Sequence, residues 1–295
     1  MTQERLDIAS VGFTGSEAAP SERLGLLDRL RARRRTWLAI RGVREFIVCA
    51  AVYVCYDGTR YLIARDHDAA YKHGRDLLKF ENSWHLNPEH ALNQVFTAHI
   101  SIGLPADYIY ATLHYIVTPW VLIWLWRRYP MSYSNARSVI IATTVVGLIG
   151  FTLYPVAPPR LLGGFQDTMS HFSHWGWWSD AGSAPRGLGA DTNQFAAMPS
   201  LHVGWALWAG YQMVRHGQHR VTRWLGALYP IVLSVVVMAT ANHYLVDVLA
   251  GVVVVGIGAV IGTNFTKLTR RIWPDHVPGA IQATVANHAE STAPA

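Results

Sequence analysis

The stretch YLVDVLAGVVVVGIGAVIGTNF, residues 244–265, decides the fold class because it is apolar over a length that can cross a membrane. It carries one charged residue, Asp247, close to its beginning. A helix needs about 20 mostly apolar residues to cross about 30 Å of hydrocarbon. The stretch therefore predicts a transmembrane helix in the last part of the chain.

Five further apolar runs reach or approach the length of a membrane span. The chain is 51% hydrophobic and 15% charged, and the charges gather between these runs. This distribution predicts an all-α membrane protein with a bundle of six transmembrane helices. The six predicted spans are Glu45–Ala64, Leu104–Trp126, Arg137–Tyr154, Ser200–Val214, Trp224–Ala241 and Tyr244–Phe265. The first and the fourth give the weakest signal.

The basic residues predict how the bundle is oriented in the membrane. They flank the second and fourth connections and follow the last span, at Arg127, Arg128, Arg137, Arg215, Arg220, Arg223, Lys267, Arg270 and Arg271. Because positive residues concentrate in cytoplasmic loops, both termini are predicted to be cytoplasmic. The same placement explains the net charge of +6 as an orientation signal, so no nucleic-acid partner is expected. We expect a multi-pass protein of the plasma (inner) membrane.

Composition divides the chain into four segments. Residues 1–23 lack periodicity and are predicted to be disordered. Residues 24–44 are predicted to form a basic amphipathic helix on an anionic cytoplasmic surface. Residues 45–271 are the predicted six-helix membrane catalytic domain, and residues 272–295 a disordered tail. No signal-peptide pattern precedes the first apolar run, which we expect to be a retained helix.

Two long connections are predicted to lie outside the membrane. The first has apolar residues from Leu77 to Phe80 and a helix-start signal at Asn87-Pro88, so it should contain extra interfacial helices. The second carries Trp175, Trp177 and Trp178, which are expected at the level of the lipid headgroups.

Three short segments with ionisable residues are predicted to meet at the outer face. They are Tyr154–Arg160 after the third span, Met198–His202 at the start of the fourth and Asn242–Asp247 at the start of the sixth. Ionisable groups at this depth are costly unless they face a polar cavity. Their coincidence therefore indicates an active site on the outer face.

His243 and Asp247 are four residues apart, which places them on one face of a helix. The carboxylate would fix the imidazole tautomer and leave the other ring nitrogen free to attack as a nucleophile. The alternative is a hydrogen-bonded pair that only holds helices together.

Ser200 follows a proline at the start of a predicted span, where it can cap the helix. The free backbone amides of the next turn would attract an anion, and His202 could donate a proton to a leaving alkoxide. The alternative is an ordinary serine cap with an exposed histidine. Tyr108, Tyr110 and His114 on the second span either line the cavity or pack as aromatic rings.

Two arginines on the outer side, Arg160 and Arg186, could grip phosphate oxygens through a bidentate guanidinium. Contact with lipid headgroups or solvent is the alternative for each. A zinc site made of His202, His243 and Asp247 fits less well, because Asp247 is better placed to orient His243 than to act as a third ligand. No metal and no cofactor are therefore expected.

With these residues, the chain resembles the type-2 phosphatidic acid phosphatase superfamily, in the branch of fungal inositol phosphorylceramide synthase. Pro199-Ser200-Leu201-His202 resembles the Pro-Ser-x-His motif, and the segment from His243 to Asp247 resembles the His-x-x-x-Asp motif. Tyr154-Pro155-Val156-Ala157-Pro158-Pro159 is similar to the aromatic-Pro-x-x-Pro-Pro element of the synthase branch. The resemblance runs from the second span to the sixth.

The resemblance implies a metal-independent reaction through a phosphohistidine. His243 would be the nucleophile, Asp247 its orienting partner, His202 the general acid and later base, and Ser200 a phosphate ligand. Water or an alcohol would then accept the phosphoryl unit.

The chain departs from the superfamily pattern at two customary cations. In the first motif Leu153 replaces a lysine and Leu161 follows Arg160 in place of a proline. Before the third motif, Val236 and Val237 replace a serine and an arginine. Charge neutralisation is the main task in phosphoryl transfer, so the two outer arginines are the candidate replacements.

These observations predict an integral membrane phosphotransferase acting on a lipid phosphate ester, of inositolphosphotransferase type. One alternative is a lipid phosphate or pyrophosphate phosphatase, in which water is the acceptor. A second is a non-catalytic lipid-binding or transport protein. The expected partners are the lipid substrate and the bilayer, and the sequence makes no prediction of oligomeric state.

Overall fold

The computed structural model describes residues 67–178 and 194–272, together with six separate helical positions between Val43 and Val54. The chain divides into two compact units, Met1–Val54 and Cys55–Ala295, and every labelled helix belongs to the second. The predicted disordered segment 1–23, almost all of the basic segment 24–44 and nearly all of the tail 272–295 lie outside the described residues.

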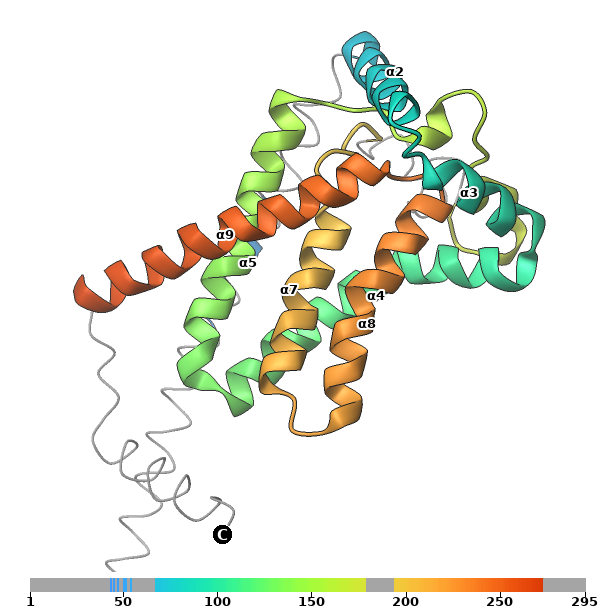
Figure 1. The fold of residues 1–295 in the computed structure, drawn as a ribbon. Coiled ribbons are helices and arrows are strands. Elements are labelled where there is room, and N and C mark those ends of the chain that lie inside the picture. Colours follow the sequence, from blue (N-terminus) through green and yellow to red (C-terminus); the bar gives the residue numbers. More distant parts are fainter. Residues whose placement is uncertain are drawn as a thin grey trace, which may run out of the picture. The chain divides into compact units, whose positions relative to one another are not determined.

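Within the described ranges the protein is all-helical, as predicted, and its extended pairing is limited to one isolated parallel bridge between Val156 and Ala196. Figure 1 shows the order of the helices along the chain. The α-helices are α2 (His67–Ser83), α3 (Pro88–Ala98), α4 (Ile100–Arg128), α5 (Pro130–Leu153), α6 (Thr168–His171), α7 (Leu201–His216), α8 (Arg220–Ala239) and α9 (Leu245–Ile272). Two short 3-10 turns are η1 (Pro159–Leu161) and η2 (Ser173–Trp175).

Four helices, α4, α5, α8 and α9, are long and apolar enough to cross a membrane. The chain is therefore a multi-pass membrane protein. Helix α7 has 16 residues and is about 24 Å long at 1.5 Å per residue, which is shorter than the hydrocarbon layer. Most of the predicted first span lies outside the described residues. The six-span bundle and the cytoplasmic termini stay predictions.

The helices extend beyond the apolar runs that predicted them. Helix α5 begins at Pro130, so Arg137 lies inside the helix and not at its beginning, where the predicted third span started. Helix α4 begins at Ile100 and ends at Arg128, which leaves Tyr129 alone between the two helices. Hydropathy detects the part of a helix that suits lipid, whereas backbone hydrogen bonding continues into the polar residues on either side.

Small residues allow close contact between α5 and α9. A Cβ atom at Gly262 of α9 would lie 2.5 Å from the backbone nitrogen of Val139, and one at Gly258 would overlap Thr143 of α5. Glycines four residues apart let helix backbones approach in lipid, where packing replaces the hydrophobic effect as the driving force. This seam fixes α9, the helix that carries Asp247, against the bundle.

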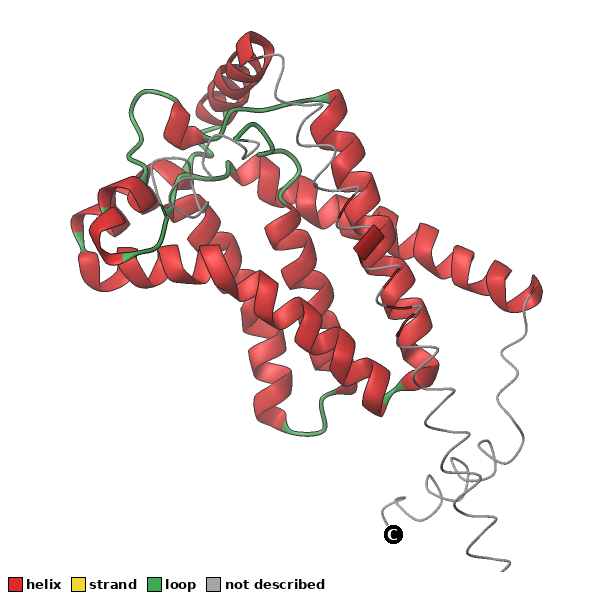
Figure 2. Cartoon of the chain, turned by 180° about the vertical axis from the view of Figure 1, so that it is seen from behind, coloured by secondary structure: helices red, strands yellow, loops and turns green. Residues whose placement is uncertain are grey.

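Helices α2 and α3 lie at the end of the bundle where α9 begins, and both views show the long loops gathered there (Figures 1 and 2). The predicted helices of the first outer connection are thus confirmed as helices. Helix α3 starts at Pro88 after Asn87, as the start signal indicated. Their predicted position at the membrane interface stays a prediction.

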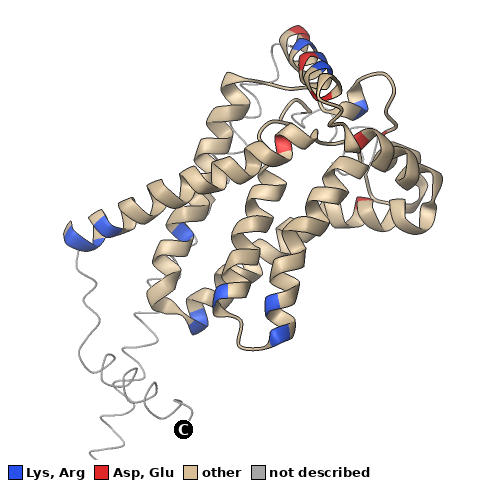
Figure 3. Cartoon of the chain, viewed as in Figure 1, with Lys and Arg blue, Asp and Glu red and all other residues tan. Residues whose placement is uncertain are grey.

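Charges are distributed unequally between the two ends of the bundle (Figure 3). The described acidic residues of the second unit lie toward the end that carries α2 and α3. The α4–α5 and α7–α8 connections, at the other end, are flanked by arginines alone. This asymmetry is the basis of the predicted orientation.

One of the three tryptophans of the second outer connection was placed wrongly by the sequence. Trp178 is fully buried, and its Nε1 donates a hydrogen bond to the Met169 carbonyl over 2.7 Å. Trp175 and Trp177 are exposed, as expected of a loop at the headgroup level. Composition gives no sign of which tryptophan of such a cluster packs inward.

Candidate active site

His243 lies in the tight turn between α8 and α9. Its backbone amide and that of Asn242 both donate to the Val237 carbonyl over 3.1 Å. Ala241 in this turn has a φ of 52°, in the left-handed region that residues other than glycine seldom adopt. The Asn242 side chain donates to the Thr240 carbonyl over 3.1 Å. The turn is therefore held by its own hydrogen bonds, which fix the backbone position from which the imidazole extends.

The His243 ring is buried, with 3% of the residue exposed, and its Nδ1 faces two acceptors. The Ala197 carbonyl oxygen lies 2.8 Å away and Asp247 Oδ2 lies 3.5 Å away. Because a carbonyl oxygen can only accept, Nδ1 carries a proton in the hydrogen-bonded state. The assignment from this network leaves Nε2 as the nitrogen with a free lone pair.

Asp247 joins the ring to the first turn of α9. Its Oδ2 accepts the Tyr244 amide hydrogen over 2.9 Å, and its Oδ1 has no hydrogen-bond partner among the described residues. The Asp247 backbone carbonyl accepts the amide hydrogen of Ser200 over 3.0 Å. One residue thus contacts both sequence motifs, and the carboxylate is buried beside the histidine.

Ser200 caps helix α7. Its hydroxyl oxygen accepts the Val203 amide hydrogen over 3.5 Å, and its carbonyl accepts that of Gly204 over 3.0 Å. The first turn of α7 contains no acidic residue. This helix start therefore keeps the positive end of its dipole uncompensated by any carboxylate of its own.

His202, in the first turn of α7, lies beside His243 with 5.6 Å between the ring centroids. Two rings of α4 pack on it: Tyr110 stacks at 4.7 Å and His114 meets it edge-on at 4.4 Å. Both α4 residues thus belong to the wall around His202. Tyr108 packs elsewhere, against Trp177 and Trp178.

Arg160, in η1, is fixed beside the turn that precedes His243. Its amide hydrogen is donated to the Ala241 carbonyl over 2.8 Å, and its guanidinium donates to the Asn242 side-chain oxygen. Its Nε lies 3.8 Å from Asp167 Oδ2, so an acidic side chain already shares this cation. Arg186, the other predicted phosphate ligand, lies outside the described residues.

Several groups around the site were not predicted from the sequence. The Ala197 carbonyl is the nearer partner of the His243 ring, and Asn242 links that turn to Arg160. Glu81 of α2 reaches the first turn of α9. A backbone acceptor such as the Ala197 carbonyl has no sequence signal. Asn242 could have been identified because it directly precedes the motif histidine.

Within the residues that the structure describes, no group of three His, Cys, Asp or Glu side chains is arranged to hold a metal ion. Nδ1 of His243, one of the two ring nitrogens that could bind zinc, is turned to the Ala197 carbonyl. The second ring nitrogen is the one left for chemistry.

Comparison with protein families gives a match. The model described as the PAP2 superfamily matches residues 75–261. The chain belongs to the PAP2 superfamily. The match extends from α2 into α9 and includes both histidine motifs and Arg160. Neither a curated protein nor a solved structure gives a significant match.

Membership of the PAP2 superfamily indicates phosphatase or phosphotransferase activity on lipid phosphates. Members of the superfamily are generally enzymes of these two kinds. A bilayer environment agrees with the four membrane-crossing helices.

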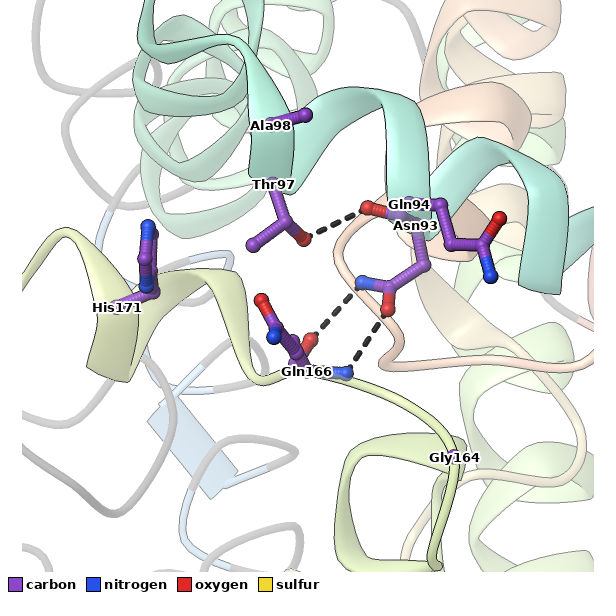
Figure 4. Close-up of a pocket in the computed structure, with 7 residues that line it drawn as sticks. All are labelled: Asn93, Gln94, Thr97, Ala98, Gly164, Gln166 and His171. Carbon is purple, nitrogen blue, oxygen red and sulfur yellow. Dashed lines mark hydrogen bonds between the residues drawn. The ribbon is translucent and has the colours of Figure 1, made fainter.

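A separate pocket of about 470 Å³ opens between α3 and residues 164–171 of this PAP2 protein (Figure 4). Asn93 lines it, donating to the Gln166 carbonyl over 2.9 Å and accepting the Gln166 amide hydrogen over 2.9 Å. Its lining consists of Asn93, Gln94, Thr97, Ala98, Gly164, Gln166 and His171. None of the predicted site residues lines this pocket.

Proposed function

We propose that this PAP2 protein is a membrane phosphotransferase that acts on a lipid phosphate ester through a covalent phosphohistidine on His243. The observation that supports this most directly is the fixed tautomer of His243, whose Nδ1 lies 2.8 Å from the Ala197 carbonyl and 3.5 Å from Asp247. That arrangement leaves Nε2 as the attacking atom.

In the first step Nε2 of His243 attacks the phosphorus, and the bond from phosphorus to the leaving oxygen breaks. His202, whose ring lies beside that of His243, gives a proton to the leaving alkoxide. The phosphorylated imidazole becomes positively charged, and Asp247 stabilises that charge. In the second step His202 takes a proton from the acceptor, whose oxygen displaces His243 from phosphorus.

The phosphate oxygens would be held at the start of α7 and by Arg160. The first amides of α7 and the Ser200 hydroxyl lie at a helix start without acidic residues, which favours an anion. Arg160 supplies a cation beside the His243 turn and replaces one of the two customary cations that the sequence lacks. Arg186 is the second proposed cation.

The acceptor is proposed to be an alcohol, by resemblance to the inositol phosphorylceramide synthase branch, and the active site to lie on the outer face of the plasma membrane. The element Tyr154–Pro159, which resembles that branch, leads into Arg160. The Pro155 carbonyl in this element accepts a hydrogen bond from His73 over 2.8 Å when His73 Nδ1 carries the proton. Incubating the purified protein with a labelled lipid phosphate and excess inositol or diacylglycerol tests this. Release of free phosphate alone would refute transfer to an alcohol and favour the phosphatase alternative.

To test the nucleophile, the protein is allowed to react with labelled phosphatidic acid, the reaction is quenched, and the labelled residue is mapped. We expect an acid-labile, base-stable adduct on His243 and none in His243→Ala, whose rate falls by at least about 10³-fold. A chelator should leave the rate unchanged if the reaction is metal-independent. Full activity in His243→Ala would instead favour a lipid-binding or transport protein.

A further inference from the structure

Two buried carboxyl groups lie close to the site but outside both motifs. Glu81 of α2 is 1% exposed and Glu89 of α3 is 0% exposed. Within the described residues no lysine, arginine or histidine forms an ion pair with either one. Burying an unpaired carboxylate is costly, so an arrangement that retains two of them needs a compensating contact.

Glu81 makes that contact with the helix that carries Asp247. Its Oε1 accepts the backbone amide hydrogen of Val246, in the first turn of α9, over 2.7 Å. The amides of the first helical turn have no partner within their own helix. Glu81 therefore caps α9 from a different helix, 165 residues away in the chain.

Glu89 lies close enough to Glu81 for each buried carboxyl group to act on the other. By hydrogen-bond geometry, both oxygens of Glu89 and Oε2 of Glu81 are buried without a partner among the described residues. Two carboxyl groups can hydrogen-bond to each other only when one of them holds a proton. A proton shared by the pair would satisfy these buried oxygens.

Burial favours that protonated state. Burial, followed by the hydrogen bond to Glu89, raises the pKa of Glu81 to about 9. Burial also raises the pKa of Glu89. The nearby charge of Asp247 acts in the same direction on both groups. At neutral pH the pair thus carries at most one negative charge.

The turn that Glu81 caps is linked to His243 and to Ser200 through Asp247. Val246 is followed by Asp247, whose carboxylate faces His243 and whose carbonyl accepts the Ser200 amide hydrogen. A shift of this turn would move Asp247 and Ser200 together. The contact of Glu81 with Val246 gives its effect a path through α9.

We propose that Glu81 and Glu89 are positioning residues, which act as a proton-sharing carboxyl pair that fixes the first turn of α9 and thereby aligns Asp247 with His243. The inference rests on the proposed function of His243 as the nucleophile. It assigns to helices α2 and α3 a part in catalysis without contact with the substrate.

The carboxyl pair should make activity sensitive to high pH. The titratable groups that face the pair are Asp247 and Tyr244, both from the start of α9, and their charged forms are negative. When the pair loses its proton, like charges are confined together beside Asp247 with no described cation to offset them. We expect the turn to loosen and activity to fall as the pH passes about 9.

The test compares Glu81→Ala, Glu81→Gln and the control Asp76→Ala in the full-length protein. Asp76 lies on the same helix, where its exposed side chain is 3.9 Å from Lys79. With phosphatidic acid in mixed micelles, Glu81→Ala should lower kcat about tenfold or more with little change in KM, because the Val246 amide loses its acceptor. Glu81→Gln should restore most of kcat, since an amide oxygen accepts and an amide nitrogen donates to Glu89.

A pH profile separates positioning from a purely structural role. The double variant Glu81→Gln/Glu89→Gln has no titratable group in the pair, so its activity should persist above pH 9, where that of the wild type declines. If the activity of the wild type and of the double variant declined at the same alkaline pH, the proposal would be overturned. A wild-type kcat in Glu81→Ala would also overturn it. If Glu81→Ala does not fold, as judged by thermal unfolding in detergent, the profile of the double variant decides.

The outcomes separate this inference from the proposed function. Full activity in His243→Ala refutes the nucleophile and with it the positioning role. Loss of activity in His243→Ala together with wild-type behaviour of Glu81→Ala refutes the positioning role alone.

Discussion

Helices α7 and α9 both begin at the candidate site, and their first turns differ in charge. Helix α7 is capped by Ser200, its own neighbour in sequence, and has no acidic residue in its first turn. Helix α9 has Asp247 in its first turn and is also capped by Glu81 from α2, with Glu89 buried beside it. One helix start is electrostatically open and the other is already occupied by carboxyl groups.

This difference indicates what each helix start can do. The positive end of the α9 dipole is used to stabilise carboxyl groups of the protein, so a phosphate there would meet like charge. At α7 the amides and the hydroxyl of Ser200 have no such competitor. The comparison supports a division in which α9 orients the nucleophile and α7 binds the transferred group.

The largest expected effect comes from removing the charge on the α9 side. Asp247→Asn keeps the size of the side chain and an oxygen for the Tyr244 amide, but it cannot stabilise a positive imidazole. We expect kcat on phosphatidic acid to fall on the order of 10³-fold. The matched control is Asp76→Asn on α2, which should behave as the wild type. A change of less than about twofold in Asp247→Asn would mean that the Ala197 carbonyl orients His243 alone.

A smaller effect is expected on the α7 side. Ser200→Ala removes both the cap and the hydroxyl, and should lower the rate about 10²-fold and the free energy of unfolding by about 1 kcal/mol. Ser200→Thr restores the cap and a hydroxyl, and should recover much of both. Initial rates and thermal unfolding of the same preparations check this. A loss of stability without a loss of rate would reduce Ser200 to a helix cap and remove the proposed role of α7.

The smallest effect concerns stability and sharpens the account of α9. The pKa of Glu81 is raised from 4.5 to about 9 in the folded protein, so the folded state keeps a proton that the unfolded chain releases. The free energy of unfolding should therefore decrease as the pH rises from about 5 to about 9. Glu81→Gln should flatten this decrease, as measured by thermal unfolding across that pH range. Parallel curves for wild type and variant would contradict the shared proton.

The hydropathy pattern predicted the membrane helices better than it predicted their ends. It located α4, α5, α8 and α9, yet α5 begins at Pro130 where the apolar run begins at Arg137. A helix continues wherever its backbone bonds are made, and polar residues such as Ser132 make them as well as apolar ones. Likewise the tryptophan cluster did not reveal that Trp178 alone is buried, because burial depends on a partner such as Met169.

The two histidine motifs could be recognised because each has a short, fixed spacing. The separation of four residues between His243 and Asp247 places them together on any helix, and the structure brings their side chains within 3.5 Å. The neighbourhood of His202 was less accessible to prediction. His114 and Tyr110 meet it from α4, and nothing in their spacing indicates which residue of α7 they contact.

The sequence by itself determined that the chain is helical, crosses a membrane and carries a histidine–carboxylate pair, since each of these depends on contacts within one helix. Only the tertiary structure decided that Ala197 holds the imidazole and that Glu81 caps the helix of Asp247. These contacts join residues far apart in the chain. Their geometry is set by how closely the helices pack, at seams such as that of Gly262 with Val139, and no local period of the sequence encodes it.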